Sequence, residues 1–184
     1  MQEGEPGVRM REKRGIHQRG SRKMEFMKYL IALLAVAGMA ISAMALHVHL
    51  MDPNAAPPCA VSEHWDCGVV GHSRYSWFPP KTFDEKPGAL HIPVAAVGIA
   101  GYAVIAIFAL MGRLRIVLEL ARIGFFCAAF LSYIEAYVIQ MWCIYCVWSQ
   151  AIIAALLVAS VVAVVMRQRR RAASMRTVLA EHVD

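Results

Sequence analysis

Charged side chains are scarce in this sequence. Of its 184 residues only 17% are Asp, Glu, Lys or Arg, against about 25% in an ordinary soluble domain. Residues 29–50 contain none of them, while 59% of the whole chain is apolar and its mean hydropathy is +0.49. This composition excludes a soluble globular domain and a disordered chain. The sequence also contains no internal repeat, so it is not a fibrous repeat protein.

Acidic residues are scarcer than basic ones, and the basic ones gather at the two ends. The chain has 13 acidic and 19 basic residues, which gives a net charge of +6, and residues 1–28 and 167–184 carry eight and five of the basic ones. Basic ends can bind nucleic acid, but positive flanks of membrane helices explain them more simply. We therefore expect an integral membrane protein and no nucleic-acid partner.

Four apolar segments are long enough to cross a membrane. They are residues 29–46, 92–112, 123–141 and 147–166, and only the third contains a charge, that of Glu135. About 20 apolar residues make one spanning helix, and lipid leaves an open backbone unsatisfied. The expected fold is an all-α membrane protein, a four-transmembrane-helix bundle over residues 28–166.

The distribution of charge also predicts the orientation. Arg113 and Arg115 follow the second segment, and Arg122 is spaced to pair with Glu119 one helical turn away. The loop of residues 51–91 carries only three basic residues and five acidic ones. The positive-inside rule then places both ends in the cytoplasm and this loop outside. We expect the tails, residues 1–27 and 167–184, to be disordered.

Two pairs of cysteines fall on the expected outer side. Cys59 and Cys67 belong to the long loop, while Cys143 and Cys146 open the fourth segment as a Cys-x-x-Cys. The N-terminus of a helix favours a thiolate, which is the attacking species in disulfide exchange. A bond between the loop cysteines closes a small ring, worth roughly 2.5 kcal/mol, and a bond so weakly favoured is easily reduced.

Other interpretations of the cysteines stay open. Both pairs could form inert disulfides that staple the outer side of a structural tetraspan protein. A thiol and histidine metal-ion carrier is the second alternative, with Cys59, His64, Cys67 and His72 as ligands. Their spacing matches no familiar zinc finger and leaves the second pair unexplained, so we expect no metal site. Cys127, in the third segment, is expected to be a small buried apolar residue.

The order of these residues resembles the bacterial homologues of vitamin K epoxide reductase. The resemblance covers residues 28–166. Its features are Cys59 and Cys67 with seven residues between them, Ser73 six residues after Cys67, the Ile92-Pro93-Val94 segment followed by Gly98 and Tyr102, and Trp142-Cys143-Ile144-Tyr145-Cys146.

The resemblance implies a fold, a reaction and roles for residues. A four-helix bundle would hold a quinone near the outer surface, with the loop as a cap. A thioredoxin-like partner would pass electrons to Cys59, Cys67 would exchange with Cys143, and Cys146 would face the quinone. Ser73 would hydrogen-bond near the quinone. The net result would be oxidation of a partner dithiol and reduction of a quinone to quinol in the bacterial plasma membrane.

Two further features refine these expectations. Residues 167–184 are too few for the thioredoxin-like domain that many family members carry there, and they lie on the wrong side, so we expect a separate DsbA-type partner. Gln150 stands where vertebrate members have Tyr, and Ala95 replaces a polar residue. Both favour a respiratory quinone, ubiquinone or menaquinone, over vitamin K epoxide.

Two polar side chains of the expected bundle are candidate quinone contacts. Glu135 is either a proton source and hydrogen-bond partner for the quinone or a carboxylate that reaches interfacial water. Gln150 lies one turn after Cys146 on the same helix face, so it either lines the quinone pocket or bonds to a neighbouring helix. For its neighbour Ser149 we expect a packing role.

Overall fold

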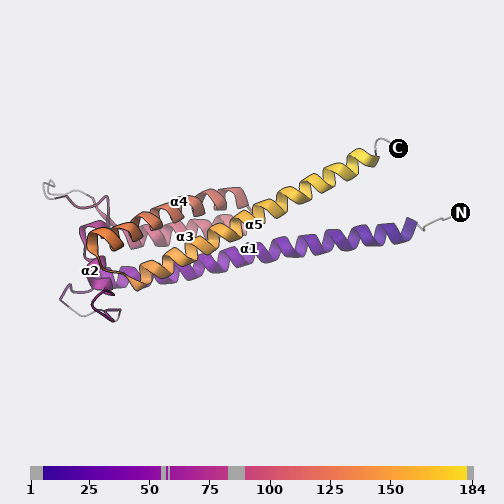
Figure 1. Ribbon diagram of the computed structural model, residues 1–184. Coiled ribbons are helices and arrows are strands. Elements are labelled where there is room, and N and C mark those ends of the chain that lie inside the picture. Colours follow the sequence, from indigo (N-terminus) through magenta and orange to yellow (C-terminus); the bar gives the residue numbers. More distant parts are fainter. Residues whose placement is uncertain (1–5, 55–56, 58, 83–89, 182–184) are drawn as a thin grey trace.

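The computed structural model describes residues 6–54, 57, 59–82 and 90–181. Within them, four long helices lie along one another as a bundle (Figure 1). They are α1 (Pro6–Leu50), α3 (Val94–Leu110), α4 (Leu114–Ile134) and α5 (Ile144–Glu181). Helix α1 packs against α3 and α5, and α4 packs against α5 and α3.

The short elements gather at one end of this bundle. Helix α2 (Cys67–Gly71) is followed by a 3₁₀ turn, η1 (Arg74–Ser76), and by strand β1 (Trp77–Phe78), which pairs antiparallel with β2 (Ile92–Pro93). In Figure 1 this end lies opposite to both termini of the chain. The expected outer loop is therefore at the end where α1 stops and α5 begins; its residues 83–89 lie outside the described part.

Both basic tails are helical where the structure describes them. Residues 6–27 form the first part of α1, and residues 167–181 form the last part of α5. These stretches are rich in Arg, Lys, Met and Ala, which are strong helix formers. Charge marks where the membrane segment ends, but it does not end the helix.

Helix α4 also begins before the apolar segment expected from the sequence, residues 123–141. Helix α4 starts at Leu114. Its first turns contain Arg122 and Glu119, which form the predicted pair on the exposed surface, with Nη1 and Oε2 3.1 Å apart. The helix then changes to a π-helical turn, η2 (Glu135–Ile139). It stops at Gln140, whose φ of 59° lies in the left-handed region.

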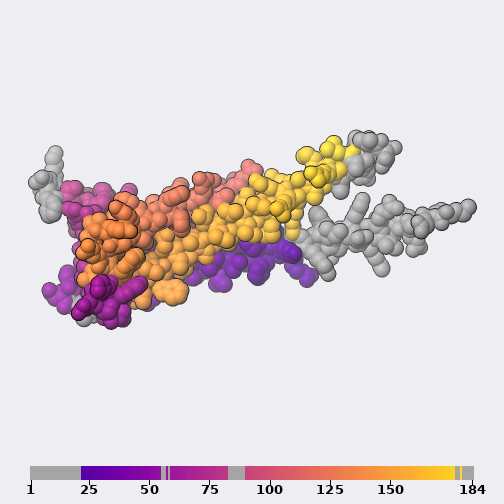
Figure 2. All heavy atoms as spheres, in the orientation of Figure 1, coloured from indigo at the N-terminus to yellow at the C-terminus, as the bar shows by residue number. Residues whose placement is uncertain are grey.

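The outward faces of the bundle are apolar, as expected of a protein in lipid. Leu33 is 67% exposed, Phe126 66% and Val158 63%. Figure 2 shows the helices packed along one another in the bundle. The segments Arg22–Leu50 and Ile144–Arg176 are long and apolar enough to cross a membrane, while the apolar helix α3 has 17 residues.

The interior of the bundle depends on close contact between α1 and α3. Tyr102 of α3 is 5% exposed and belongs to the same apolar core as Ile31 and Leu156. Its ring lies directly over Gly38 of α1. Its hydroxyl donates a hydrogen bond to the Ser149 carbonyl oxygen at 2.9 Å, so one side chain joins three helices.

Substitution of Gly38 tests this contact. In Gly38→Ala the new Cβ would lie 2.5 Å from Cε1 of Tyr102, and we expect overpacking to lower the free energy of unfolding by about 1–3 kcal/mol. Gly101→Ala is the control, because its Cβ would meet nothing within 4 Å. Thermal unfolding in detergent measures both, and equal melting temperatures would contradict the packing.

Candidate active site

Four cysteines meet at the end of the bundle that carries the short elements. Cys59, Cys67 and Cys143 are 4%, 1% and 3% exposed and share one apolar cluster with Val48. Cys146 packs against the same cluster. The two pairs that are separated by 76 residues of sequence, counted from Cys67 to Cys143, are thus neighbours in space.

The loop pair is joined in a disulfide. Cys59 and Cys67 have Cα atoms 5.8 Å apart, a usual separation for bonded cysteines. Cys67 is the first residue of α2, and Asp66 caps this helix by accepting the N–H groups of Gly68 and Val69 at 2.7 and 3.3 Å. The cap satisfies N–H groups that have no partner within the helix and so holds Cys67 in place.

Two backbone hydrogen bonds join the loop to the start of α5. The Asp66 N–H donates to the Trp142 carbonyl oxygen at 3.1 Å, and the Trp142 N–H donates to the His64 carbonyl oxygen at 2.9 Å. The rings of Trp65 and Trp142 lie 6.2 Å apart. Because Asp66 and Trp142 directly precede Cys67 and Cys143, this pairing brings these two cysteines together.

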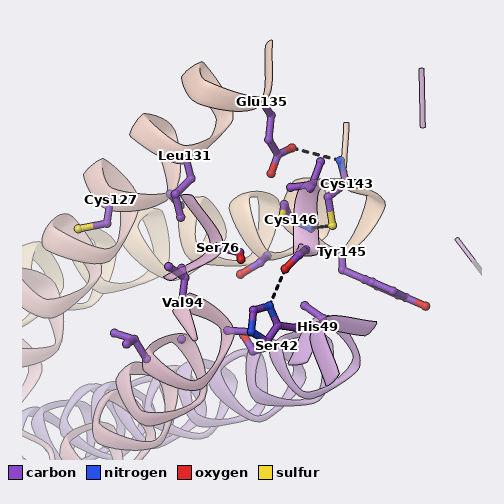
Figure 3. Close-up of a pocket in the computed structure, with 18 of the residues that line it drawn as sticks. Ser42, His49, Ser76, Val94, Cys127, Leu131, Glu135, Cys143, Tyr145 and Cys146 are labelled. Carbon is purple, nitrogen blue, oxygen red and sulfur yellow. Dashed lines mark hydrogen bonds between the residues drawn. The ribbon is translucent and has the colours of Figure 1, made fainter. Parts of the chain in front are cut away.

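The second pair is reduced and lies beside a carboxylate. Cys143 and Cys146 are free thiols, and the Cys146 N–H donates to Sγ of Cys143 at 3.4 Å. Oε2 of Glu135 accepts the Cys143 N–H at 3.2 Å (Figure 3). Glu135 is only 2% exposed, so the expectation that it reaches interfacial water is wrong.

A cavity of about 370 Å³ opens beside these thiols (Figure 3). Cys143, Cys146 and Glu135 line it, together with residues of α1, α2, η1, α3, α4 and α5. Val97 of α3 and Ile123 of α4 line the cavity although they are 45% and 62% exposed. The cavity therefore reaches the apolar surface of the bundle between α3 and α4.

Three of the four predicted quinone contacts line this cavity. Ser73, Glu135 and Cys146 line it, whereas Gln150 does not. The Gln150 side chain has a buried Oε1 atom for which the described residues provide no hydrogen-bond partner. Ser149 lines the cavity instead, and it also accepts the Tyr102 hydroxyl, as its expected packing role requires.

For three other residues that line the cavity, the sequence indicated either no such position or a different one. His49 is 9% exposed and bonds through Nδ1 to the Gly71 carbonyl oxygen, although its place at the end of an apolar segment indicates only an interfacial residue. Tyr102 also lines the cavity. Cys127 is exposed rather than buried, on the α4 side of the cavity.

Comparison with protein families decides between the interpretations. The model of the vitamin K epoxide reductase family matches residues 29–161. The chain belongs to this family. Members have a four-transmembrane-helix fold and are thiol enzymes that reduce quinones, which confirms the expected fold class and an oxidoreductase activity. Comparison with individually curated proteins gives no match.

The cap of α2 offers a test of how Cys67 is held. Asp66→Ala removes the acceptor of two N–H groups, which costs about 1 kcal/mol, so we expect the Gly68 and Val69 amides to exchange hydrogen roughly fivefold faster. Glu63→Ala removes a charge from the exposed surface of the same loop and should leave these rates unchanged. Hydrogen exchange read by mass spectrometry measures both, and equal rates in the two variants would contradict the role of the cap.

Proposed function

We propose that this vitamin K epoxide reductase family member oxidises a separate DsbA-type protein outside the bacterial plasma membrane and reduces ubiquinone or menaquinone within it. The observation that carries the proposal is the meeting of both cysteine pairs beside one cavity. One pair is a disulfide and the other is a dithiol. The two states that an electron relay needs are thus present side by side.

Transfer between the pairs is proposed to run from Cys67 to Cys143. The partner dithiol first reduces the loop disulfide, with Cys59 as the residue it meets. The Cys67 thiolate then attacks Sγ of Cys143 in an oxidised Cys143–Cys146 pair, and Cys146 leaves as a thiolate. Attack by Cys59 on Cys67 restores the loop disulfide and leaves the second pair reduced. The backbone pairing at Trp142 supports this order, since it joins the residues before Cys67 and Cys143.

The cavity fits the ring of a quinone. Its volume lies in the range of small-molecule sites, and apolar side chains form most of its wall, with several serine and tyrosine hydroxyl groups among them. We propose that Ser73 contacts a quinone oxygen and that Cys146 faces the ring, while Gln150, which is not on the wall, is assigned no contact. A bound quinone supplies the acceptor for two electrons and two protons. The opening between α3 and α4 suits a substrate that diffuses in lipid.

The orientation and the partner follow from where the charges lie. Sixteen of the nineteen basic residues fall in the two tails or near the turn between α3 and α4, at the end opposite to the cysteines (Figure 1). This supports both termini in the cytoplasm and the cysteines outside. We propose that a separate thioredoxin-like protein approaches the cysteines from this outer side.

The alternative interpretations have less support. Two of the four ligands of the metal-carrier hypothesis, Cys59 and Cys67, are joined in a disulfide. A structural tetraspan protein needs the loop disulfide, but it has no use for two free thiols next to a buried carboxylate and beside a cavity.

Quinol formation tests the proposed function. Purified protein given a reduced DsbA-type protein and ubiquinone or menaquinone should produce quinol, followed by absorbance. Cys146→Ser should produce none, because the thiol that faces the quinone is lost, yet its loop pair should still oxidise one equivalent of partner. Full quinol formation by Cys146→Ser would contradict the proposal.

A trapped disulfide tests the order of transfer. With Cys59→Ser and Cys146→Ser combined, Cys67 and Cys143 are left without their usual partners, and mild oxidation should join them. The matched variant, Cys67→Ser with Cys146→Ser, leaves Cys59 and Cys143 and should form the corresponding bond more slowly. Peptide mapping without reduction identifies each bond, and faster joining in the matched variant would reverse the proposed order.

A further inference from the structure

Two histidines join the end of α2 to the end of α1, and each bonds to a backbone carbonyl oxygen of the other segment. His49, in the last turn of α1, donates from Nδ1 to the Gly71 carbonyl oxygen (Figure 3). His72, which follows α2, donates from Nε2 to the Met51 carbonyl oxygen at 3.1 Å. The two rings stack with their centroids 6.2 Å apart. Because Cys67 is the first residue of α2, this reciprocal contact fastens the short helix that carries it.

The two histidines differ in the number of acceptors that they meet. His49 makes one ring hydrogen bond within the described part of the chain, and a neutral ring has the single N–H that this bond needs. His72 meets a second acceptor, because its Nδ1 lies 2.8 Å from the Gly68 carbonyl oxygen. A carbonyl oxygen has no proton to donate, so both ring nitrogens of His72 must be donors. Only the positively charged imidazolium form of histidine has two N–H groups.

Loss of this proton would remove one of the two bonds of His72. A neutral ring keeps one N–H and turns the lone pair of its other nitrogen toward a carbonyl oxygen, which repels it. If Nδ1 keeps the proton, the bond to Met51 is lost and α2 is released from α1 at this point. If Nε2 keeps it, the repulsion acts at Gly68, inside α2. In both cases the remaining bond also loses its charged donor, and charged donors make hydrogen bonds about twice as strong as neutral ones.

We propose that His72 is a positioning residue that carries a positive charge and fastens α2, and with it Cys67, to α1 more firmly in acidic than in neutral or alkaline solution. The inference goes beyond the proposed function, because it adds control by pH to the placement of the loop pair. Over the range in which an unbonded histidine loses its proton, the fastened loop holds more protons than the opened loop. The stability of the fastened state therefore falls as the pH rises, and the fall should lie between about pH 5 and 8.

Other titratable groups lie on the elements that meet near His72. Carboxylates lose their protons near pH 4, and tyrosine, lysine and arginine lose theirs near pH 10 or above, so these groups keep their charge in the relevant range. His49 and His91 can titrate within it, and both rings contact Trp77, with centroids 4.6 and 6.3 Å away. The remaining groups are Asp52 after α1, Asp66 before α2, Arg74 and Tyr75 of η1, and Lys81, whose Nζ lies over the Trp77 ring.

Hydrogen exchange of α2 at two pH values tests the proposal. The full chain in detergent is exchanged at about pH 5.5 and pH 8, which bracket the usual titration of histidine. Mass spectrometry follows the peptide that contains the amides of His72 and Ser73, which donate to the Gly68 and Val70 carbonyl oxygens at 2.9 and 3.2 Å. Each rate is divided by the intrinsic rate of an unstructured peptide at the same pH, which gives a protection factor.

The protection factor of this peptide should be about tenfold lower at pH 8 than at pH 5.5, the effect of losing one hydrogen bond of a charged donor. Peptides of α4 should keep their protection and serve as the internal reference. Equal protection of the α2 peptide at both pH values would overturn the proposal. Because neither a partner protein nor a quinone enters the experiment, its outcome is independent of the proposed function.

Three variants assign the pH dependence to His72. His72→Gln has no charge, so its α2 peptide should show the lower protection at both pH values. His72→Arg keeps its charge and several N–H donors at every pH, so it should keep the higher protection at pH 8. His47→Gln changes an exposed histidine of α1 and should behave like the unmodified chain.

Two results with these variants would contradict the role of His72. A tenfold fall that persists in His72→Gln would assign the proton to His49 or His91. A fall of the same size in His72→Arg would show that the fastening does not follow the charge at this position. If the His72 variants do not fold, the unmodified chain still decides, because equal protection at both pH values overturns the proposal without them.

Discussion

The active site depends on the pairing of one loop residue with one residue at the start of α5. Within the described part of the loop, the hydrogen bonds of Asp66 and His64 with Trp142 are the only backbone link to the start of α5. Without them the loop disulfide would be covalently closed but not aligned with the second pair. Thiol exchange requires nearly direct contact of sulfur atoms, so this small piece of backbone pairing determines whether two cysteine pairs act as one site.

The same pairing explains how the loop disulfide can be buried although the loop is held by only weak backbone bonds to α5. Cys59 and Cys67 are 4% and 1% exposed, so water and unrelated thiols are kept from the disulfide. Two neutral backbone hydrogen bonds contribute only about 1–3 kcal/mol together. The bundle below is held by an extensive apolar core, whereas the loop above it is held by few bonds. The bonds that hold the loop over the second pair are thus separate from the core that holds the helices.

Sequence reasoning succeeded where one physical constraint dominates. The separation of basic from apolar residues predicts the helices and one side for all four cysteines, because the cost of charge in lipid overrides local detail. It failed where the answer depends on packing between helices. Gln150 shares a helix face with Cys146, but only the position of α3 shows that Ser149, bonded to Tyr102, lines the cavity. Helix ends were also missed, since Arg and Lys stop a membrane segment without stopping a helix.

Glu135 shows most clearly what a sequence leaves out. Its spacing from the apolar residues around it indicates a carboxylate near the membrane surface, where water would be the natural partner. The chain instead makes a π-helical turn and a left-handed residue, Gln140, which redirect the backbone so that Glu135 lies behind Cys143 and Cys146. A π-helical turn is uncommon and is frequent at functional sites, and here its effect is specific. It converts a carboxylate that would be solvated into one that is buried and accepts the backbone N–H of Cys143.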